Sequence, residues 1–316
     1  AMSSARPHTP LPVRPVARGM RAFLYLATVL TFAAGLQATV LAEHSATFFA
    51  WDIQPPMGAV FIGASFWSAC VLLAWSSRQR DWARARITVP SVAVVSLLLL
   101  GATLAHIDQF GSLLGIAWIE VYAFTPPLAI AFTVVQLAAP GRDPERLERL
   151  PAVLRGVLGA QTLIMAAAGL ALWIAPNDTG WWPWVVGPMT AKAIGTWLLG
   201  TATVGTYLVV RDDREDLPGA MLSYVVLGAL LLLGALRFGG DFDDTTATAI
   251  YLAMAASTLA VGLAGAWLCQ REGRYRSVQP VGGLPVQLAP LNGARAADTV
   301  ERDESVRLPL SSPIMR

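Results

Sequence analysis

The sequence predicts an all-α integral membrane protein of eight transmembrane helices, arranged as two parallel tandem four-helix repeats. Composition, the length of the apolar runs and an internal duplication carry this prediction. Apolar residues make up 55% of the chain and charged residues only 14%, whereas a soluble domain carries about a quarter charged residues. The charges also lie between long apolar runs, which excludes an ordinary soluble domain.

Eight apolar runs are each close to the roughly 20 residues that cross a hydrocarbon core. A chain inside lipid must satisfy its own backbone hydrogen bonds, so each run is expected to be a helix. The first run is too long for the apolar core of a signal peptide. The expected spans are 20–42, 57–77, 87–107, 116–139, 152–175, 189–210, 220–238 and 248–269.

The chain repeats itself at an offset of 132 to 134 residues. FFAW at 48–51 is echoed by WWPW at 181–184. Since each unit holds four spans, the two copies are expected to have the same orientation, related by an axis along the membrane normal. The further matches are PMGAVFIG from Pro56 with PMTAKAIG from Pro188, LLLLGATLAHID at 97–108 with LLLLGALRFGGD at 230–241, Arg21 with Arg155, and AAGL at 33–36 with 167–170.

The arginines outside the spans lie on one side of the predicted bundle, and the positive-inside rule places that side in the cytoplasm. Both termini are therefore expected to be cytoplasmic, in the inner (plasma) membrane of a bacterium, a source that the preference for Arg over Lys favours. Residues 1–19 and 271–316 are expected to be disordered tails. A cytoplasmic linker at 140–151, with a short helical turn, is expected to join the repeats at 20–139 and 152–270.

The opposite loops carry acidic residues and no basic ones. Acidic residues cross the membrane readily, so this bias follows in part from topology alone. A functional interpretation is an outer surface that attracts cations, and the carboxylates of the segment GGDFDD offer oxygen ligands for a hard metal ion. Its three candidate ligands are Asp241, Asp243 and Asp244, although their spacing is not that of a full calcium loop.

His106, Asp108 and Glu120 lie around the predicted turn between the third and fourth spans, with Glu43 and His44 at the end of the first. One interpretation is a hydrogen-bonded pair of His106 and Glu120 that joins two helices. The other is an outward-facing polar pocket for a metal ion, a proton or a headgroup, because an ionisable group inside a span is costly. Two histidines on one side are too few to indicate haem.

Arg237 lies about one turn from the outer end of the seventh span. A guanidinium at that depth needs a partner or must extend toward the headgroups. We predict that it pairs with Glu120 across the two halves, since both lie at similar depth with opposite charge. The only lysine, Lys192, is expected either to extend to the interface or to contact an anion.

Two aromatic–proline segments, FFAWDIQPP and WWPWVVGP, precede the second and sixth spans. They are typical of an aromatic belt at the membrane surface, and the alternative is a pair of half-inserted segments beside a lipid-binding groove. Pro126 and Pro127 are expected to kink or break the fourth span.

No nucleotide-binding, hydrolase or zinc-protease motif is present, and nucleic acid is not expected as a partner. The sequence favours a non-enzymatic membrane protein whose polar, acidic outer surface binds a partner subunit or a lipid headgroup. A carrier with its pathway between the repeats is the first alternative. A small metal-dependent enzyme or redox protein with an outer-face site is the second, and no cofactor is indicated.

Overall fold

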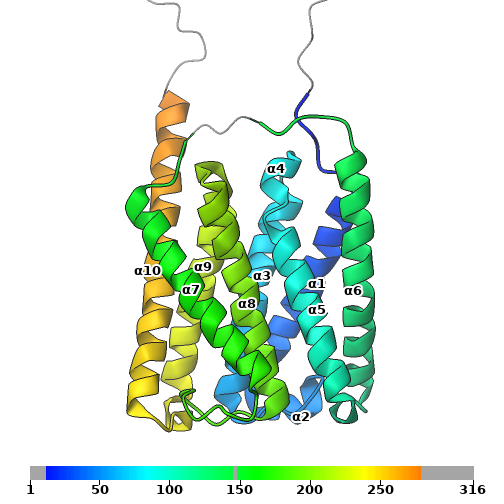
Figure 1. The fold of residues 1–316 in the computed structure, drawn as a ribbon, viewed down its shortest axis with the longest axis vertical. Helices are drawn as coiled ribbons and strands as arrows, with labels where there is room; N and C mark the ends of the chain where they lie inside the picture. Colours follow the sequence, from blue (N-terminus) through cyan, green and yellow to red (C-terminus); the bar gives the residue numbers. More distant parts are fainter. Residues whose placement is uncertain (1–11, 145–147, 279–316) are drawn as a thin grey trace, which may run out of the picture. The chain divides into compact units, whose positions relative to one another are not determined.

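The computed structural model describes residues 12–144 and 148–278, with side chains as far as residue 271. This part of the chain contains eight helices that are long and apolar enough to cross a membrane. The eight expected spans are thus confirmed as helices, and the chain has the architecture of a multi-pass membrane protein (Figure 1). The helices are α1 (Arg18–Val40), α3 (Pro56–Ser77), α5 (Thr88–Ala105), α6 (Leu113–Ala138), α7 (Ala152–Ile174), α8 (Pro188–Arg211), α9 (Leu217–Arg237) and α10 (Thr245–Val278).

Short helical segments join the long helices at both ends of the bundle. The acidic end is formed by residues 41–55, 106–112, 175–187 and 238–244, and the basic end by residues 78–87, 139–144, 148–151 and 212–216. The basic end is at the top of Figure 1. The short segments are the α-helices α2 (Ser45–Phe48) and α4 (Trp82–Ala85) and the 3₁₀ turns η1 (Ala42–His44), η2 (Ile107–Gln109), η3 (Arg214–Asp216) and η4 (Gly239–Asp241).

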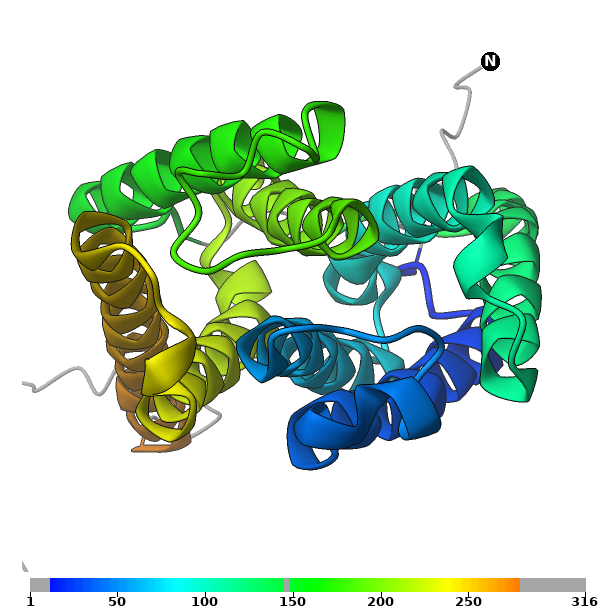
Figure 2. The same cartoon turned by 90° about the horizontal axis from the view of Figure 1, so that it is seen from below.

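Helices α3 and α8 lie at the centre of the bundle, as the view from the acidic end shows (Figure 2). Of the apolar stretch of α3, 78% is buried inside the protein, against 22% for α1. Helix α1 packs on α3 and α7 on α8, while α3 also packs on α9 and α8 on α5. Helix α6 packs on α5 and, less extensively, on α1. The outer helices therefore present their remaining apolar faces to lipid.

Prolines and side-chain caps mark where several helices begin. Pro56 and Pro188 stand in the first turns of α3 and α8, where a fixed φ and a missing N–H cost nothing. Ser112 caps α6 by accepting a hydrogen bond from the amide of Gly115 at 3.0 Å. The expected break at Pro126 and Pro127 is wrong, because α6 continues as one helix through both residues.

Glycines bring pairs of helices into direct backbone contact. A Cβ atom added at Gly195 of α8 would lie 2.7 Å from the carbonyl oxygen of Gly169 in α7. On the other side of the bundle, a Cβ atom at Gly63 of α3 would lie 2.8 Å from the backbone nitrogen of Thr39 in α1. Small residues allow this close approach, which drives helix association in lipid.

The aromatic–proline segments are folded into the protein rather than spread along its surface. Trp51 and Trp184 are 3% and 1% exposed, and Trp182 is 8% exposed. The expected aromatic belt is therefore wrong for these side chains, although Phe48 and Trp181 remain exposed. The buried rings close the acidic end of the helix bundle by packing on one another.

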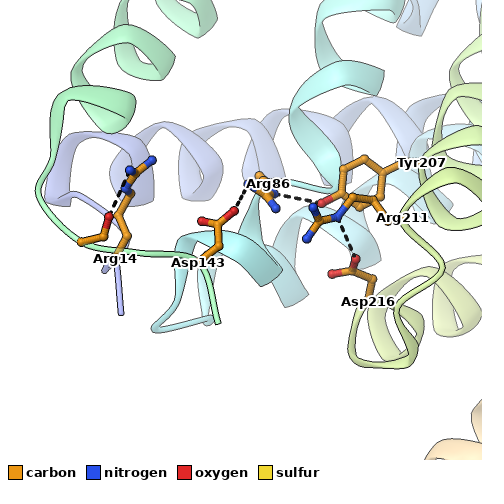
Figure 3. Close-up of polar contacts among 7 residues, drawn as sticks. Arg14, Arg86, Asp143, Tyr207, Arg211 and Asp216 are labelled. Atoms are coloured by element: carbon orange, nitrogen blue, oxygen red, sulfur yellow. Dashed lines mark hydrogen bonds and ion pairs between the residues drawn. The ribbon is translucent and has the colours of Figure 1, made fainter. Parts of the chain in front are cut away.

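Polar contacts at the basic end tie the segment between α6 and α7 to the helices (Figure 3). Arg86 donates hydrogen bonds to Asp143 at 2.7 Å and to the hydroxyl of Tyr207 in α8 at 3.1 Å. The side chain of Asp216 is buried, with its carboxylate 3.9 Å from the guanidinium of Arg211. The positive charge of this end is thus partly neutralised by fixed carboxylates.

Much of the two predicted tails lies outside the described residues. Residues 12–17, which the sequence places in the N-terminal tail, form backbone hydrogen bonds: the amide of Arg14 donates to Arg142 and that of Val16 to Arg80. In the described parts of the expected linker, residues 140–144 and 148–151, the chain forms no helical turn.

Candidate functional site

The residues that the sequence singled out at the acidic end lie at separate positions on its surface. The Nδ1 atom of His106 is 2.9 Å from the carbonyl oxygen of Ala102 in its own helix. The side chains of His44, Asp108 and Glu120 are exposed and make no hydrogen bond or ion pair with other described residues. The expected pair of His106 and Glu120 is therefore not formed in the structure.

Arg237 pairs with Glu43 of η1 at 3.4 Å, and its guanidinium lies 4.7 Å from the ring centre of Phe238. The predicted pair with Glu120 is wrong. Helix α9 packs on α3 rather than on α6, and the sequence does not show which helices are neighbours.

We expect Arg237→Gln to change the free energy of unfolding by less than about 1 kcal/mol, because both partners of this ion pair are about half exposed. Thermal unfolding of the single variants and of Arg237→Gln combined with Glu43→Gln measures the coupling. A coupling well above that value would contradict a surface role for the pair.

The three aspartates of the expected metal site have different roles. Asp241 accepts a hydrogen bond from the amide of Met57 at 2.9 Å and caps α3. Asp244 accepts one from the amide of Ala247 at 2.6 Å and caps α10. Asp243 is exposed. Within the described ranges, no three His, Cys, Asp or Glu side chains are placed to hold a metal ion.

Lys192 caps the end of α7. Its Nζ atom donates to the carbonyl oxygen of Trp173 at 2.8 Å and lies 4.1 Å from the ring centre of the same residue. Lys192 was expected to extend to the interface or to contact an anion. Neither is needed to explain its position, because the unpaired carbonyl groups at a helix C-terminus attract a cation.

A cavity of about 260 Å³ lies within the bundle, between α1, α3, α5, α6 and α8. Residues of α1 from Ala27 to Gln37 and of α6 from Leu114 to Thr125 form two of its walls. Among the described residues, no Asp, Glu, Lys, Arg or His side chain lines it. Its size is at the lower limit of ligand pockets, which run from roughly 300 to 1,000 Å³.

Aromatic rings form the wall of the cavity nearest the acidic end. The rings of Phe66 and Trp197 have centres 4.6 Å apart, and those of Trp118 and Tyr122 are 4.5 Å apart. Phe49, from the first aromatic–proline segment, packs on Trp118 at 5.5 Å. The segment that the sequence placed at the membrane surface therefore shapes an internal site instead.

Most hydroxyl groups in the wall already donate to backbone carbonyl oxygens. Ser65 donates to Phe61 at 2.9 Å, and Ser91 donates to Gly200 at 3.0 Å. Four lining residues differ from these, because their side chains form no hydrogen bond with other described residues: Gln37, Tyr122, Trp197 and Tyr224. The indole nitrogen of Trp197 and the hydroxyl of Tyr224 are enclosed by the protein, whereas the polar atoms of Gln37 and Tyr122 are not.

The cavity reaches the lipid-facing surface between α1 and α6. Leu30 and Leu114 both line it and are 39% and 36% exposed on the outside. These helices meet near the basic end, where the rings of Phe23 and Phe132 are 5.6 Å apart. Gln136 strengthens that contact by accepting a hydrogen bond from the amide at residue 17 at 2.7 Å.

No protein-family model, curated protein or solved structure matches the chain. The function is therefore inferred from the geometry of the cavity. Gln37 and Tyr122 were not among the residues that the sequence indicated. The sequence feature that could have indicated Gln37 is its position inside an apolar run. A polar side chain within a span costs free energy unless it has a hydrogen-bond partner.

Proposed function

We propose that this multi-pass membrane protein binds a lipophilic molecule that it takes from the bilayer. The observation that carries the proposal is an uncharged cavity that extends from the aromatic wall to the lipid-facing surface between α1 and α6. A molecule dissolved in lipid can enter there without passing through water. Apolar walls with a few polar groups are typical of small-molecule sites.

Other functions are less well supported by the geometry. A carrier for ions or polar solutes needs polar groups along its pathway, whereas the charged candidates Glu120 and Arg237 are exposed near the acidic end. A metal-dependent enzyme needs converging ligands, and the described acidic residues do not converge.

Docking of a partner subunit or a lipid headgroup on the acidic end remains a separate proposal. The carboxylates of Asp52, Asp108, Asp178 and Asp243 are exposed there, and their loops contain no Lys or Arg. Co-purification of a second membrane protein after mild solubilisation, reduced when these aspartates are replaced by asparagine, is the expected result.

The proposed orientation places the basic end in the cytoplasm of a bacterial inner membrane, with both termini on that side. The arginines of the basic end and the lack of basic residues in the loops 43–56 and 176–188 support it. Labelling of single cysteines introduced at positions 178 and 80 in intact cells distinguishes the two possible orientations.

We further propose that the two halves arose by duplication of a four-helix unit. Under the sequence offset, α1, α3 and α5 correspond to α7, α8 and α9. The packing of α1 on α3 is therefore repeated by α7 on α8, and that of α3 on α9 by α8 on α5. The ring of Trp51 packs on Trp118 at 5.2 Å, and its counterpart Trp184 packs on Tyr251 at 5.3 Å.

The halves differ where the cavity lies. Helices α7 and α10 are linked by a hydrogen bond from Gln161 to Ser257, whereas the corresponding positions on α1 and α6 are Ala27 and Phe124. Ala27 lines the cavity. We infer that the first half has kept or gained a binding role while the second half closed the equivalent seam.

Mass spectrometry of the purified protein tests the proposed function. The wild type, extracted in mild detergent and then washed, is expected to retain a lipophilic molecule in stoichiometric amount. Ala34→Phe places a ring in the cavity and is expected to lose it, and Ala117→Phe provides the same test from α6.

The matched control is Val29→Phe, because Val29 is 64% exposed on α1 and does not line the cavity. That variant is expected to retain the bound molecule. If wild type carries no lipophile after exposure to total lipid extract, or if folded Ala34→Phe and Ala117→Phe retain as much as wild type, the proposal is wrong.

A further inference from the structure

We propose that the bound molecule is a neutral lipophile that carries carbonyl oxygens, which accept hydrogen bonds from Tyr122 and Gln37. This inference rests on the proposed function. It starts from Tyr122 and Gln37, whose polar side-chain atoms have no partner among the described residues and are not enclosed by the protein. Tyr122 is only 8% exposed, and a ligand that accepts a hydrogen bond from its sheltered hydroxyl gains binding free energy.

Both unpartnered side chains can act as hydrogen-bond donors. The hydroxyl of Tyr122 and the amide of Gln37 can both donate. Hydroxyls such as that of Ser96 already donate to a carbonyl oxygen, at 2.7 Å. Acceptors on the ligand therefore satisfy the donors of both side chains, and the amide oxygen of Gln37 can accept in addition.

The charge of the site restricts the ligand further. A carboxylate, phosphate or ammonium group in this cavity would be buried without an ionised partner, because the described residues of the lining include no charged side chain. Such burial costs far more than the burial of a neutral carbonyl group. Free fatty acids and phospholipid headgroups are thus disfavoured, while ketone, quinone and ester carbonyls satisfy the donors.

The shape of the site favours a planar carbonyl-bearing group. Phe66, Trp118 and Trp197 supply ring faces and edges along one wall, and aromatic pairs add attraction beyond their buried area. A volume of about 260 Å³ accommodates a ring and not a long chain. The chain of such a ligand would leave between Leu30 and Leu114 and lie in the bilayer.

Equilibrium binding to the full-length protein in detergent tests the inference with three probes: a short-chain isoprenoid quinone, a diacylglycerol, and squalene as a hydrocarbon without acceptors. Quenching of tryptophan fluorescence reports binding to the wall. Quinone is expected to bind more tightly than squalene. Tyr122→Phe and Gln37→Leu are each expected to weaken quinone binding about fivefold, as for one hydrogen bond.

The matched control is Tyr25→Phe, since Tyr25 is 45% exposed on α1 and does not line the cavity. It is expected to bind quinone as wild type does. Because the hydroxyl of Tyr122 has no partner among the described residues, Tyr122→Phe without ligand is expected to unfold at or above the wild-type temperature, which separates lost binding from lost folding.

The outcomes distinguish this inference from the proposed function. Preferential binding of diacylglycerol, weakened by Tyr122→Phe, supports carbonyl recognition with an ester as its source. Equal binding of squalene and quinone, unaffected by either variant, overturns the inference and leaves a lipophile site in place. Failure of all three probes, with no co-purified lipophile, overturns both.

Discussion

Gly195→Leu is expected to prevent this protein from accumulating as a folded species. A Cβ atom at Gly195 would lie 2.7 Å from the carbonyl oxygen of Gly169 and 3.1 Å from the backbone nitrogen of Trp173. Overpacked side chains typically cost about 1–3 kcal/mol. Here the obstructing atoms belong to the backbone of α7, so α7 and α8 must separate and the cost is expected to exceed that range.

Size-exclusion chromatography of the detergent-solubilised variant, followed by thermal unfolding of any monodisperse fraction, measures this effect. The matched control is Gly159→Leu on α7, because a Cβ atom there meets no other atom within 4 Å. Gly159→Leu is expected to behave as wild type. Wild-type stability in Gly195→Leu would show that α7 and α8 do not meet as described.

Gln136→Leu is expected to lower the free energy of unfolding by about 1–3 kcal/mol, the usual cost of leaving a buried polar group unpaired. The side chain of Gln136 is fully buried. It accepts a hydrogen bond from the amide of Ala17 at 2.7 Å and donates one to the carbonyl oxygen of Pro15 at 2.9 Å. Leucine retains the bulk but provides neither contact.

The control for Gln136→Leu is Gln37→Leu, the same replacement at a glutamine that has no protein partner. Its unfolding temperature in the absence of ligand is expected to equal that of wild type, since no hydrogen bond is lost. Equal losses in the two variants would argue against Gln136 as the residue that joins the N-terminal segment to α6.

The spans were predictable because lipid imposes a single rule on the backbone. The expected run at 57–77 corresponds to α3 (Pro56–Ser77), and the run at 152–175 to α7 (Ala152–Ile174). An apolar stretch of that length has no stable alternative to a helix in a bilayer. Prolines contributed further, since Pro56 and Pro188 lie where their helices begin.

The candidate site was less predictable, because it depends on which helices are neighbours. The sequence predicts similar depths in the membrane for Glu120 and Arg237, yet Arg237 forms its ion pair with Glu43. Tyr122 and Gln37 are far apart in the chain, and only the placement of α1 beside α6 brings them to one cavity. Hydropathy records depth along a span and not the direction in which a side chain points.

The aromatic segments show the same limit. Tryptophans near the ends of spans are enriched both at membrane surfaces and in buried contacts. Composition therefore cannot distinguish Trp181, which is 44% exposed, from Trp182, which is 8% exposed. The neighbouring rings of Phe61 and Trp184 make that distinction in the folded chain.

By itself, the sequence determined the number, length and order of the membrane-spanning helices, because the bilayer tests each apolar run independently of the others. The tertiary structure alone decided that a cavity lies between α1 and α6, that its described lining carries no charged side chain, and that Tyr122 and Gln37 line it without a partner among the described residues. Those features arise from contacts between helices, which depend on shape and direction, and no single span contains that information.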